Sequence, residues 1–290
     1  MTLEQRIQGC FFGLAVGDAL GVPVEFNDRE SLERSPVLDM RGFGTWNQPA
    51  GTWSDDSSLA FCTAESLCNG YDLNDIGRSF VRWYKGGYWG AHHKVFDIGN
   101  ATRAAIDKLN NGVDALHSGN TSEDSNGNGS LMRIAPASIY FHKLPDPELR
   151  ERIKEISGIT HAHNTSISMC YEFSKMMQAI IAGKEKLIAC EKFGRMYENA
   201  PESIIKSSGY VVHTLQAAVW CFLNSNTYET AVLKAVNLGD DTDTTACVTG
   251  ALAGLYYGPD QIRDRWKTTI ARGEDIRALA SKFAAMISTQ

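Results

Sequence analysis

Two runs of glycine at intervals of four residues set the strongest limit on how this chain can fold. The first run is Gly9, Gly13, Gly17 and Gly21, and the second is Gly250, Gly254 and Gly258. Both lie in apolar segments, where a spacing of four aligns residues on one helix face and lets another backbone come close. Membrane helix dimers use similar spacing, but these segments are too short or too charged for that role. Close helix packing in a protein core is therefore favoured.

Helical periodicity continues through most of the chain. It predicts helices over residues 1–13, 57–67, 74–85, 102–109, 147–158, 166–182, 186–197, 211–223, 228–237, 243–257, 259–271 and 274–288. Alternating strands with hairpin turns are nearly absent, so the predicted class is all-α. The Asn-, Gly- and Ser-rich stretch 110–130 is interpreted as a long loop, and no repeat of 20–50 residues is present. We expect a single domain over residues 1–290.

Charge and cysteine content exclude several classes of protein. The formal charge of −6, from 28 Lys and Arg against 34 Asp and Glu, leaves no basic surface for wrapping nucleic acid or an anionic membrane. The longest uncharged run, residues 207–228, contains polar residues that a membrane span would tolerate poorly. Seven cysteines without a CxxC pair indicate free thiols. With no targeting segment visible, we expect a cytoplasmic protein.

Two acidic clusters each precede an apolar helix. They are Gly51-Thr52-Trp53-Ser54-Asp55-Asp56-Ser57 and Gly239-Asp240-Asp241-Thr242-Asp243-Thr244-Thr245. Helix capping explains one or two such residues at each helix. It does not explain three aspartates within four positions before a helix that is expected to be buried, because crowded carboxylates are costly unless a cation neutralises them.

The donor set limits which cation would fit. The available ligands are carboxylate and hydroxyl oxygens, with no Cys or His at ligand spacing beside them. This set suits Mg²⁺, Mn²⁺ or Ca²⁺ and argues against Zn²⁺. An EF-hand is excluded, because the segment after Asp241 lacks the glycine and the glutamate of that loop. Two interpretations stay open from spacing alone: one shared metal site, or capped helices with solvated loops.

Four further segments have both a functional and an ordinary explanation. Residues 126–130, Asn-Gly-Asn-Gly-Ser, are either a phosphate-binding turn that opens a helix or a flexible turn. Thr160-His161 is either a catalytic or sugar-binding pair or a surface pair. Asp97 lies between apolar residues before a helix, which it would equally well cap. Glu25, at the end of the first glycine run, has no distinguishing feature alone.

In combination, these segments resemble the ADP-ribosylglycohydrolase family. The resemblance lies in six motifs that follow one another in the family's order: Gly13-Leu14-Ala15-Val16-Gly17-Asp18-Ala19-Leu20-Gly21, Ser54-Asp55-Asp56, Gly127-Asn128-Gly129 with Met132-Arg133, Thr160-His161, Thr214-Leu215-Gln216-Ala217-Ala218-Val219-Trp220, and Asp241-Thr242-Asp243-Thr244. Each motif alone is weak, but six in order are specific. Two residues depart from the family pattern: Ser54 replaces a threonine, and Asp240 replaces a usual glycine. Neither departure removes an oxygen ligand.

The resemblance implies a compact orthogonal helical bundle around a central site for two divalent cations, Mg²⁺ or Mn²⁺. The metal ligands that it implies are Ser54, Asp55, Asp56, Asp241, Asp243 and Thr244. The substrate-binding residues that it implies are Asn128, Gly129, Ser130, Met132, His161 and Tyr210, with the glycine loop at the phosphates, His161 at the ribose and Tyr210 at the adenine. Glu25 falls where the family has a mobile glutamate over the site.

The implied activity is hydrolysis of the bond between ADP-ribose and a modified protein side chain, at the anomeric carbon of the distal ribose. Phe96-Asp97-Ile98-Gly99 resembles the arginine-directed bacterial branch of the family, so we expect ADP-ribosyl-arginine as substrate. Asp97, flanked by apolar residues, is the expected acid–base residue, and Glu25 joins it as catalytic. The implied partners are the modified protein and a cognate ADP-ribosyltransferase.

Two alternatives remain from the sequence. In the first, the enzyme acts on serine-linked, nucleic-acid-linked or small-molecule ADP-ribose. In the second, which belongs to a different class, the protein is a catalytically silent structural or ADP-ribose-binding relative.

Overall fold

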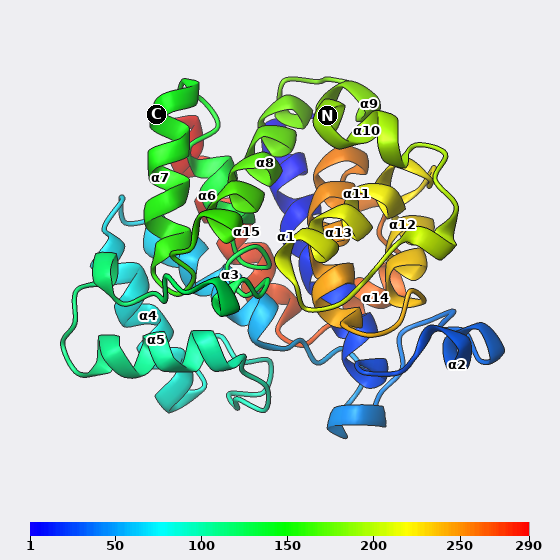
Figure 1. Ribbon diagram of the computed structural model, residues 1–290, viewed down its shortest axis with the longest axis horizontal. Helices are drawn as coiled ribbons and strands as arrows, with labels where there is room; N and C mark the ends of the chain where they lie inside the picture. The colour runs from blue at the N-terminus through cyan, green and yellow to red at the C-terminus, as the bar shows by residue number, and fades with distance from the viewer. Residues whose placement is uncertain (290) are drawn as a thin grey trace.

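The computed structural model, which describes residues 1–289, packs the helices that carry the two glycine runs against each other (Figure 1). The first run lies in α1 (Leu3–Gly21) and the second in α13 (Thr242–Tyr257). A Cβ atom on Gly13 would lie 2.3 Å from the carbonyl oxygen of Gly250. No real side chain can approach so closely, so the two backbones can touch only because glycine stands at these positions.

We call this contact the glycine seam. Its members are Gly9, Gly13, Gly17 and Gly21 of α1 and Gly250 and Gly254 of α13. Gly258 differs from them, because it has a φ of +85° and ends α13. The helices run antiparallel, so the last glycine of α1, Gly21, meets the beginning of α13. Thr242 donates a hydrogen bond of 2.9 Å to the Gly21 carbonyl there.

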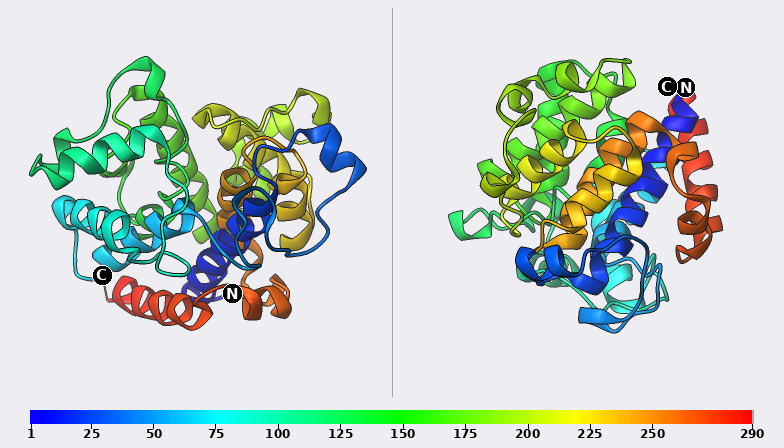
Figure 2. Two further views of the ribbon diagram at one scale, coloured as in Figure 1. Left: turned by 90° about the horizontal axis from the view of Figure 1, so that it is seen from below. Right: turned by 90° about the vertical axis from the view of Figure 1, so that its right-hand side faces the viewer.

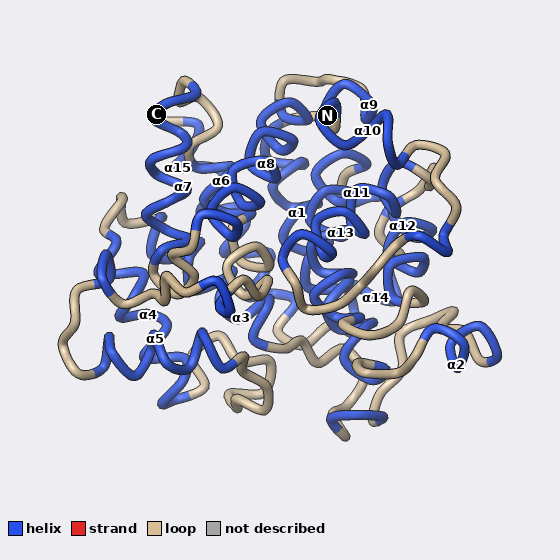
Figure 3. The backbone as a smooth tube through the Cα atoms, viewed as in Figure 1, coloured by secondary structure: helices blue, strands red, loops and turns tan. Residues whose placement is uncertain are grey.

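Helices form all the regular structure of residues 1–289 apart from short 3₁₀ turns, and no strand is present among them (Figure 3). This confirms the all-α prediction. The other helices are α2 (Arg29–Arg34), α3 (Asp55–Leu67), α4 (Leu73–Gly86), α5 (Asn100–Asn110), α6 (Ala135–Tyr140), α7 (Asp146–Gly158), α8 (Asn164–Ile181), α9 (Lys186–Ala189), α10 (Glu191–Tyr197), α11 (Val211–Leu223), α12 (Tyr228–Val236), α14 (Asp264–Thr269) and α15 (Gly273–Ser288).

The seam pair forms the centre of the molecule. α1 packs against α13 and α15, while α11 and α12 pack against α13, as the two views of Figure 2 show. The most apolar 18-residue window of Leu3–Val24 is hydrophobic enough to cross a membrane, but 94% of it is buried inside the protein. That is the environment of a core helix. The buried apolar side chains form one connected cluster from Ile7 to Ile287, which favours the prediction of a single domain.

Several helix boundaries differ from the sequence-based prediction. The first helix continues past residue 13 through the whole glycine run. The helix predicted over 186–197 divides at Cys190 into α9 and α10, because the backbone of Cys190 leaves the helical region. The helix predicted over 259–271 becomes a 3₁₀ turn and α14, since Ile262 between them is extended. The short helix α2 was not expected, and α6 begins at Ala135, four residues after the point at which the turn of residues 126–130 would open a helix.

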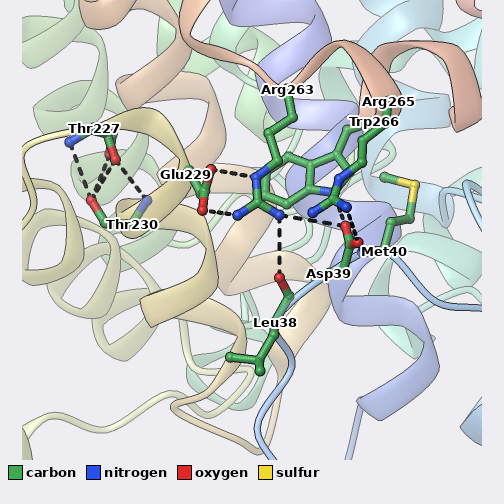
Figure 4. A network of polar contacts seen from close by, with 9 residues as sticks. All are labelled: Leu38, Asp39, Met40, Thr227, Glu229, Thr230, Arg263, Arg265 and Trp266. Carbon is green, nitrogen blue, oxygen red and sulfur yellow. Dashed lines mark hydrogen bonds and ion pairs between the residues drawn. The ribbon is translucent and has the colours of Figure 1, made fainter.

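A polar network fastens the long segment between α2 and α3 to the C-terminal helices (Figure 4). Asp39 of this segment accepts a 2.5 Å hydrogen bond from the indole N–H of Trp266 and forms a 2.9 Å ion pair with Arg265. Arg263 lies over the Trp266 ring and pairs with Glu229 of α12. The segment continues directly into the first acidic cluster. The network therefore anchors the stretch of chain that leads to that cluster.

The seam predicts a sharp difference between two glycine-to-alanine substitutions. Gly250→Ala should lower the free energy of unfolding by about 1–3 kcal/mol or more, because its Cβ would lie 2.1 Å from the carbonyl oxygen of Gly13. Gly86→Ala is the matched control, since no atom lies within 4 Å of its Cβ position in α4. The control should be neutral or stabilise the protein by about 0.5–1 kcal/mol. Urea denaturation measures both, and equal effects would contradict the seam.

Candidate functional site

The two acidic clusters, separated by almost 190 residues of sequence, meet at one end of the glycine seam. Asp55 and Asp56 lie in the first turn of α3, and Asp243 lies in the first turn of α13. All three are buried, with 6%, 2% and 1% of their surface exposed. Thr244 Oγ1 donates a 3.4 Å hydrogen bond to Asp56 Oδ2, which joins one cluster to the other.

Three carboxylate oxygens of this site have no hydrogen-bond partner within residues 1–289. They are Asp56 Oδ1, Asp241 Oδ1 and Asp243 Oδ2, all shielded from solvent. Buried carboxylate oxygens without donors are costly, and native proteins rarely leave them so. Carboxylate oxygens at the beginnings of two helices, α3 and α13, are a fitting donor set for a hard divalent cation. The residues present therefore fit the metal site that the sequence predicts, while the number and identity of ions stay a prediction.

Burial and mutual repulsion strongly favour the protonated forms of these acids when no cation is present. Burial, followed by the neighbouring charges of Asp97, Asp18 and Glu25, raises the pKa of Asp55 well above its usual range. Burial and nearby carboxylates raise the pKa of Asp56 and Asp243 in the same direction. Bound positive charge would remove this repulsion.

Asp18 of α1 holds the first cluster in position. Its side chain is fully buried; Oδ1 accepts the N–H of Ser54 at 2.9 Å, and Oδ2 accepts the N–H and the hydroxyl of Ser57 at 3.0 and 2.6 Å. These bonds satisfy free N–H groups at the start of α3. From the sequence, Asp18 belongs to a family motif but has no predicted role of its own. The available signal was a single charge inside an otherwise apolar, glycine-rich helix.

Ser54 caps α3 as the capping interpretation predicts. Its hydroxyl accepts the N–H of Asp56 at 3.2 Å and donates to Asp56 Oδ2 at 2.9 Å. The hydroxyl therefore lies against a carboxylate of the metal cluster, and capping does not remove it from the site. Its role as a ligand stays a prediction.

Glu25 and Asp97 lie within the acidic cluster in space. Carboxylate oxygens of Glu25, Asp97 and Asp243 are all within 4.8 Å of one another. Burial, and then the charge of Asp97, raises the pKa of Glu25 to about 8. Burial, and then the charge of Asp241, raises the pKa of Asp97 to about 6. Both acids are thus placed to hold a proton near neutral pH or to contact a cation.

Asp97 does not cap the helix that follows it. The N-cap residue of α5 is Gly99, and no side chain caps that helix. The structural explanation of Asp97 as a helix cap is therefore wrong. Its half-buried carboxylate faces the cavity instead.

A cavity of 360 Å³ opens above the carboxylates. It is lined by Glu25, Phe26, Asp55, Asp56, Asp97, Ile98, Gly99, Asn100, Ala101, Thr102, Gly127, Asn128, Gly129, Met132, His161, Gly209, Asp241 and Thr244. The predicted substrate residues Asn128, Gly129, Met132 and His161 are among them. The acidic residues and the Gly127–Gly129 loop therefore line the same pocket.

The glycine loop, residues 127–129, packs closely against its neighbours. A Cβ on Gly129 would lie 2.8 Å from Cε1 of His161 and 2.9 Å from Oγ1 of Thr102, so a side chain here would displace one of them. The Asn128 amide donates to Asp241 Oδ2 at 2.8 Å and to Thr214 at 2.9 Å. Asn128 therefore orients a predicted metal ligand. The predicted helix start directly after this loop is wrong, because residues 131–134 form turns and α6 begins at Ala135.

Ser130 and Tyr210 are not among the residues that line the cavity. The Ser130 hydroxyl is buried against Ser157 at 2.9 Å and Cys170 at 3.4 Å. Tyr210 is 42% exposed at the start of α11, with its ring edge-on to His213. Tyr210 is adjacent in sequence to the cavity residue Gly209, and its role at the adenine stays a prediction.

Three aromatic rings, those of Phe26, Trp46 and Phe96, form a chain of contacts, and of these Phe26 lines the cavity. The ring centroids of Phe26 and Trp46 are 6.2 Å apart, and those of Trp46 and Phe96 are 5.7 Å apart. The Trp46 indole N–H donates to Glu25 Oε2. Phe26 is 64% exposed although it lines the cavity. Trp46 was not predicted as a site residue, because it lies in an irregular segment outside the sequence motifs.

Phe26 also ties the glutamate segment to the second acidic cluster. Its N–H donates to the carbonyl of Asp240 at 2.7 Å, and the N–H of Asp240 donates to the carbonyl of Asn27 at 2.8 Å. Phe26 and Asp240 both have positive φ, 66° and 64°. Strained conformations of this kind at non-glycine residues occur where the surroundings enforce them, often at functional sites.

Comparison with known proteins relates this geometry to a family. A family model described as ADP-ribosylglycohydrolase matches residues 1–290. The chain is 34% identical to "ADP-ribosylarginine hydrolase Tri1" of Pseudomonas putida (strain GB-1), over 98% of this chain and 80% of the relative. It is 30% identical to "ADP-ribosyl-[dinitrogen reductase] glycohydrolase" of Rhodospirillum rubrum, over 91% of this chain and 90% of the relative. A solved structure titled "ADP-ribosylglycohydrolase-related protein complex" superposes with a TM-score of 0.84 at 33% identity and covers 99% of both chains.

The raised pKa values predict that the metal-free protein loses stability as pH rises. Free Asp and Glu side chains titrate near about pH 4, whereas burial raises the pKa of Asp18 to about 6 and that of Glu25 to about 8. Between these values the folded state keeps protons that the unfolded state has released, so the free energy of unfolding falls with increasing pH.

Thermal unfolding of the metal-free protein from pH 4 to pH 8 measures this trend. Mn²⁺ added at pH 8 should raise the melting temperature, because a ligand that binds the folded state stabilises it. A metal-free protein that is as stable at pH 8 as at pH 5, and that does not respond to Mn²⁺, would rule out the crowded acidic site.

Proposed function

The chain belongs to the ADP-ribosylglycohydrolase family and is an ADP-ribosylhydrolase, and we propose that it removes ADP-ribose from arginine side chains with divalent cations held by its acidic cluster. One observation supports the proposal most strongly. Three buried carboxylate oxygens, from Asp56, Asp241 and Asp243, lack any hydrogen-bond donor within residues 1–289. Asp56 and Asp241 line the cavity, and a carboxylate oxygen of Asp243 lies within 4.8 Å of those of the cavity residues Glu25 and Asp97.

We assign the cation ligands from these free oxygens. Asp56, Asp241 and Asp243 each have one oxygen to offer, while Asp55, Ser54 and Thr244 lie in the same helix ends. Two ions, Mg²⁺ or Mn²⁺, match the all-oxygen set. When bound, such cations hold ribose hydroxyls and make a water molecule more acidic.

The chain's own acids would handle the proton and charge changes of the reaction. The bond that breaks joins the anomeric carbon of the distal ribose to a guanidine nitrogen, and water supplies the new oxygen. The transition state resembles an oxocarbenium ion, so it is stabilised by nearby carboxylates. Asp97, whose pKa is raised to about 6 by burial and by Asp241, is suited to take or give a proton near neutral pH. Glu25 lies close enough to share this role.

Arginine linkage has two lines of support. The Pseudomonas relative is named an ADP-ribosylarginine hydrolase, and the outer part of the pocket has the chemistry to bind a guanidinium group. A carboxylate can pair with a guanidinium through two hydrogen bonds, and aromatic rings can stack on its plane. Asp97 supplies the carboxylate, and Phe26, Trp46 and Phe96 supply the rings.

The remaining cavity walls fit the ADP part of the substrate. We place the phosphates at the Gly127–Gly129 turn, the ribose beside His161, and the adenine toward the exposed ring of Tyr210. The protein partners are a modified protein and the transferase that modifies it. We place the reaction in the cytoplasm, because all seven cysteines are free thiols and six of them are buried.

Asp97→Asn should separate chemistry from folding. Because Asp97 does not cap α5, the variant should fold and bind ADP-ribose and Mn²⁺ like the parent, while kcat falls by roughly a hundredfold or more. Asp107→Asn, at an exposed position of α5, is the control and should keep the parent's kcat. A variant at position 97 with near-normal kcat would remove Asp97 from the acid–base role.

The linkage proposal predicts a clear order among substrates. Parent protein with Mg²⁺ or Mn²⁺ is incubated with arginine-, serine- and DNA-linked ADP-ribose, and released ADP-ribose is measured over time. Arginine-linked substrate should be hydrolysed fastest, because only its leaving group offers a planar cation to Asp97 and the rings. Release from serine-linked substrate alone would refute arginine specificity, and no release from any substrate would indicate a silent relative.

A further inference from the structure

A buried chain of hydrogen bonds leads to the wall of the cavity. Arg133 Nη2 donates to Thr160 Oγ1 at 2.8 Å, and Thr160 Oγ1 lies 2.8 Å from Nδ1 of His161. Arg133 and Thr160 are fully buried, and His161 is 2% exposed. His161 lines the cavity, whereas Arg133 and Thr160 do not.

The direction of these bonds follows from the chemistry of the groups. A guanidinium can only donate, so the Thr160 oxygen accepts from Arg133. The Thr160 hydroxyl hydrogen then needs an acceptor, and within residues 1–289 its remaining polar contact is Nδ1 of His161. If Nδ1 instead carried a hydrogen, the buried Thr160 hydroxyl would have no acceptor, which costs about 1–3 kcal/mol. Nδ1 therefore accepts.

We infer that Arg133 and Thr160 are positioning residues that fix His161 in the tautomer with its hydrogen on Nε2. The imidazole then presents an N–H donor to the cavity. The two glycines opposite, Gly127 and Gly129, keep this donor accessible from the cavity. Cβ atoms on Gly127 and Gly129 would lie 3.6 and 3.4 Å from Nε2, so their absence leaves the nitrogen uncovered.

Within residues 1–289, Arg133 has no carboxylate partner that would explain its burial. Its guanidinium lies 4.7 Å from the centre of the Phe80 ring and donates to the Ile156 carbonyl at 3.2 Å, and its Nε and Nη1 are unpartnered within residues 1–289. A buried, unpaired cation is costly, and the shortest bond of this one is to Thr160. The imidazole is also neutral, because burial, and then the charge of Arg133, lowers the pKa of His161 to about 3.

A neutral Nε2–H donor selects an oxygen acceptor in the ligand. This part of the inference rests on the proposed function, in which a ribose hydroxyl or phosphate oxygen of ADP-ribose occupies the cavity. The tautomer itself does not depend on any ligand. The two statements can therefore be tested separately.

The test compares Thr160→Val with Thr160→Ser. Valine keeps the shape of threonine but lacks the hydroxyl, whereas serine keeps the hydroxyl. Thr63→Val is the matched control, because Thr63 is also fully buried and its hydroxyl only bonds the Leu59 carbonyl within α3. Thermal unfolding checks that each variant is folded. NMR of the protein with ¹⁵N-labelled histidine reports the tautomer of His161, which a His161→Gln variant assigns, and calorimetry measures the affinity for ADP-ribose.

The parent, Thr160→Ser and Thr63→Val should all show the Nε2–H tautomer, unchanged between pH 5.5 and pH 8. Thr160→Val should show a mixture of tautomers and bind ADP-ribose about tenfold more weakly or worse. An Nδ1–H tautomer in the parent, or the parent's tautomer and affinity in Thr160→Val, would overturn the inference. If the parent binds no ADP-ribose, the proposed function fails, and the NMR result still decides whether Arg133 and Thr160 position His161.

Discussion

Direct backbone contact between α1 and α13 is the constraint on which the rest of this structure depends. Glycine at four-residue intervals lets the two helices approach until carbonyl oxygens occupy the space of Cβ atoms. The antiparallel contact ends where Gly21 meets Asp243, at 2.3 Å between a hypothetical Cβ and the Asp243 Cα. The end of one core helix therefore lies against the beginning of the other. Acids on both sides of that point are forced into one volume.

The acids at this point are held in two different ways. The carboxylate of Asp18 accepts three hydrogen bonds from Ser54 and Ser57, and these bonds hold the start of α3 in position. Asp56, Asp241 and Asp243 keep oxygens that nothing in residues 1–289 satisfies. The hydrogen-bond donors at this point therefore satisfy the carboxylate of Asp18, whereas the free oxygens of the other three acids remain able to accept a cation. A site of this kind is stable only when positive charge is bound or protons are held.

Sequence patterns predicted the long helices of this fold better than the helix boundaries and the short helices. Glycine spacing and apolar periodicity identified the two central helices and the all-α class, because both are properties of a single helix face. The division at Cys190 and the short helix α2 were missed, since they depend on tertiary contacts and on a single capping bond from Asp28. The acidic site followed from resemblance and from charge crowding. Asp18 and Trp46 did not, because their importance arises from partners distant in sequence.

The central claim is that the glycine seam assembles a cation site at the floor of the substrate cavity. Anomalous X-ray diffraction from crystals of the protein grown with Mn²⁺ tests it most directly, since the signal locates manganese independently of any assumption about ligands. The account predicts manganese between the free oxygens of Asp56, Asp241 and Asp243, at the junction of α3 and α13. Manganese absent from that junction, or bound only elsewhere on the protein, would contradict it.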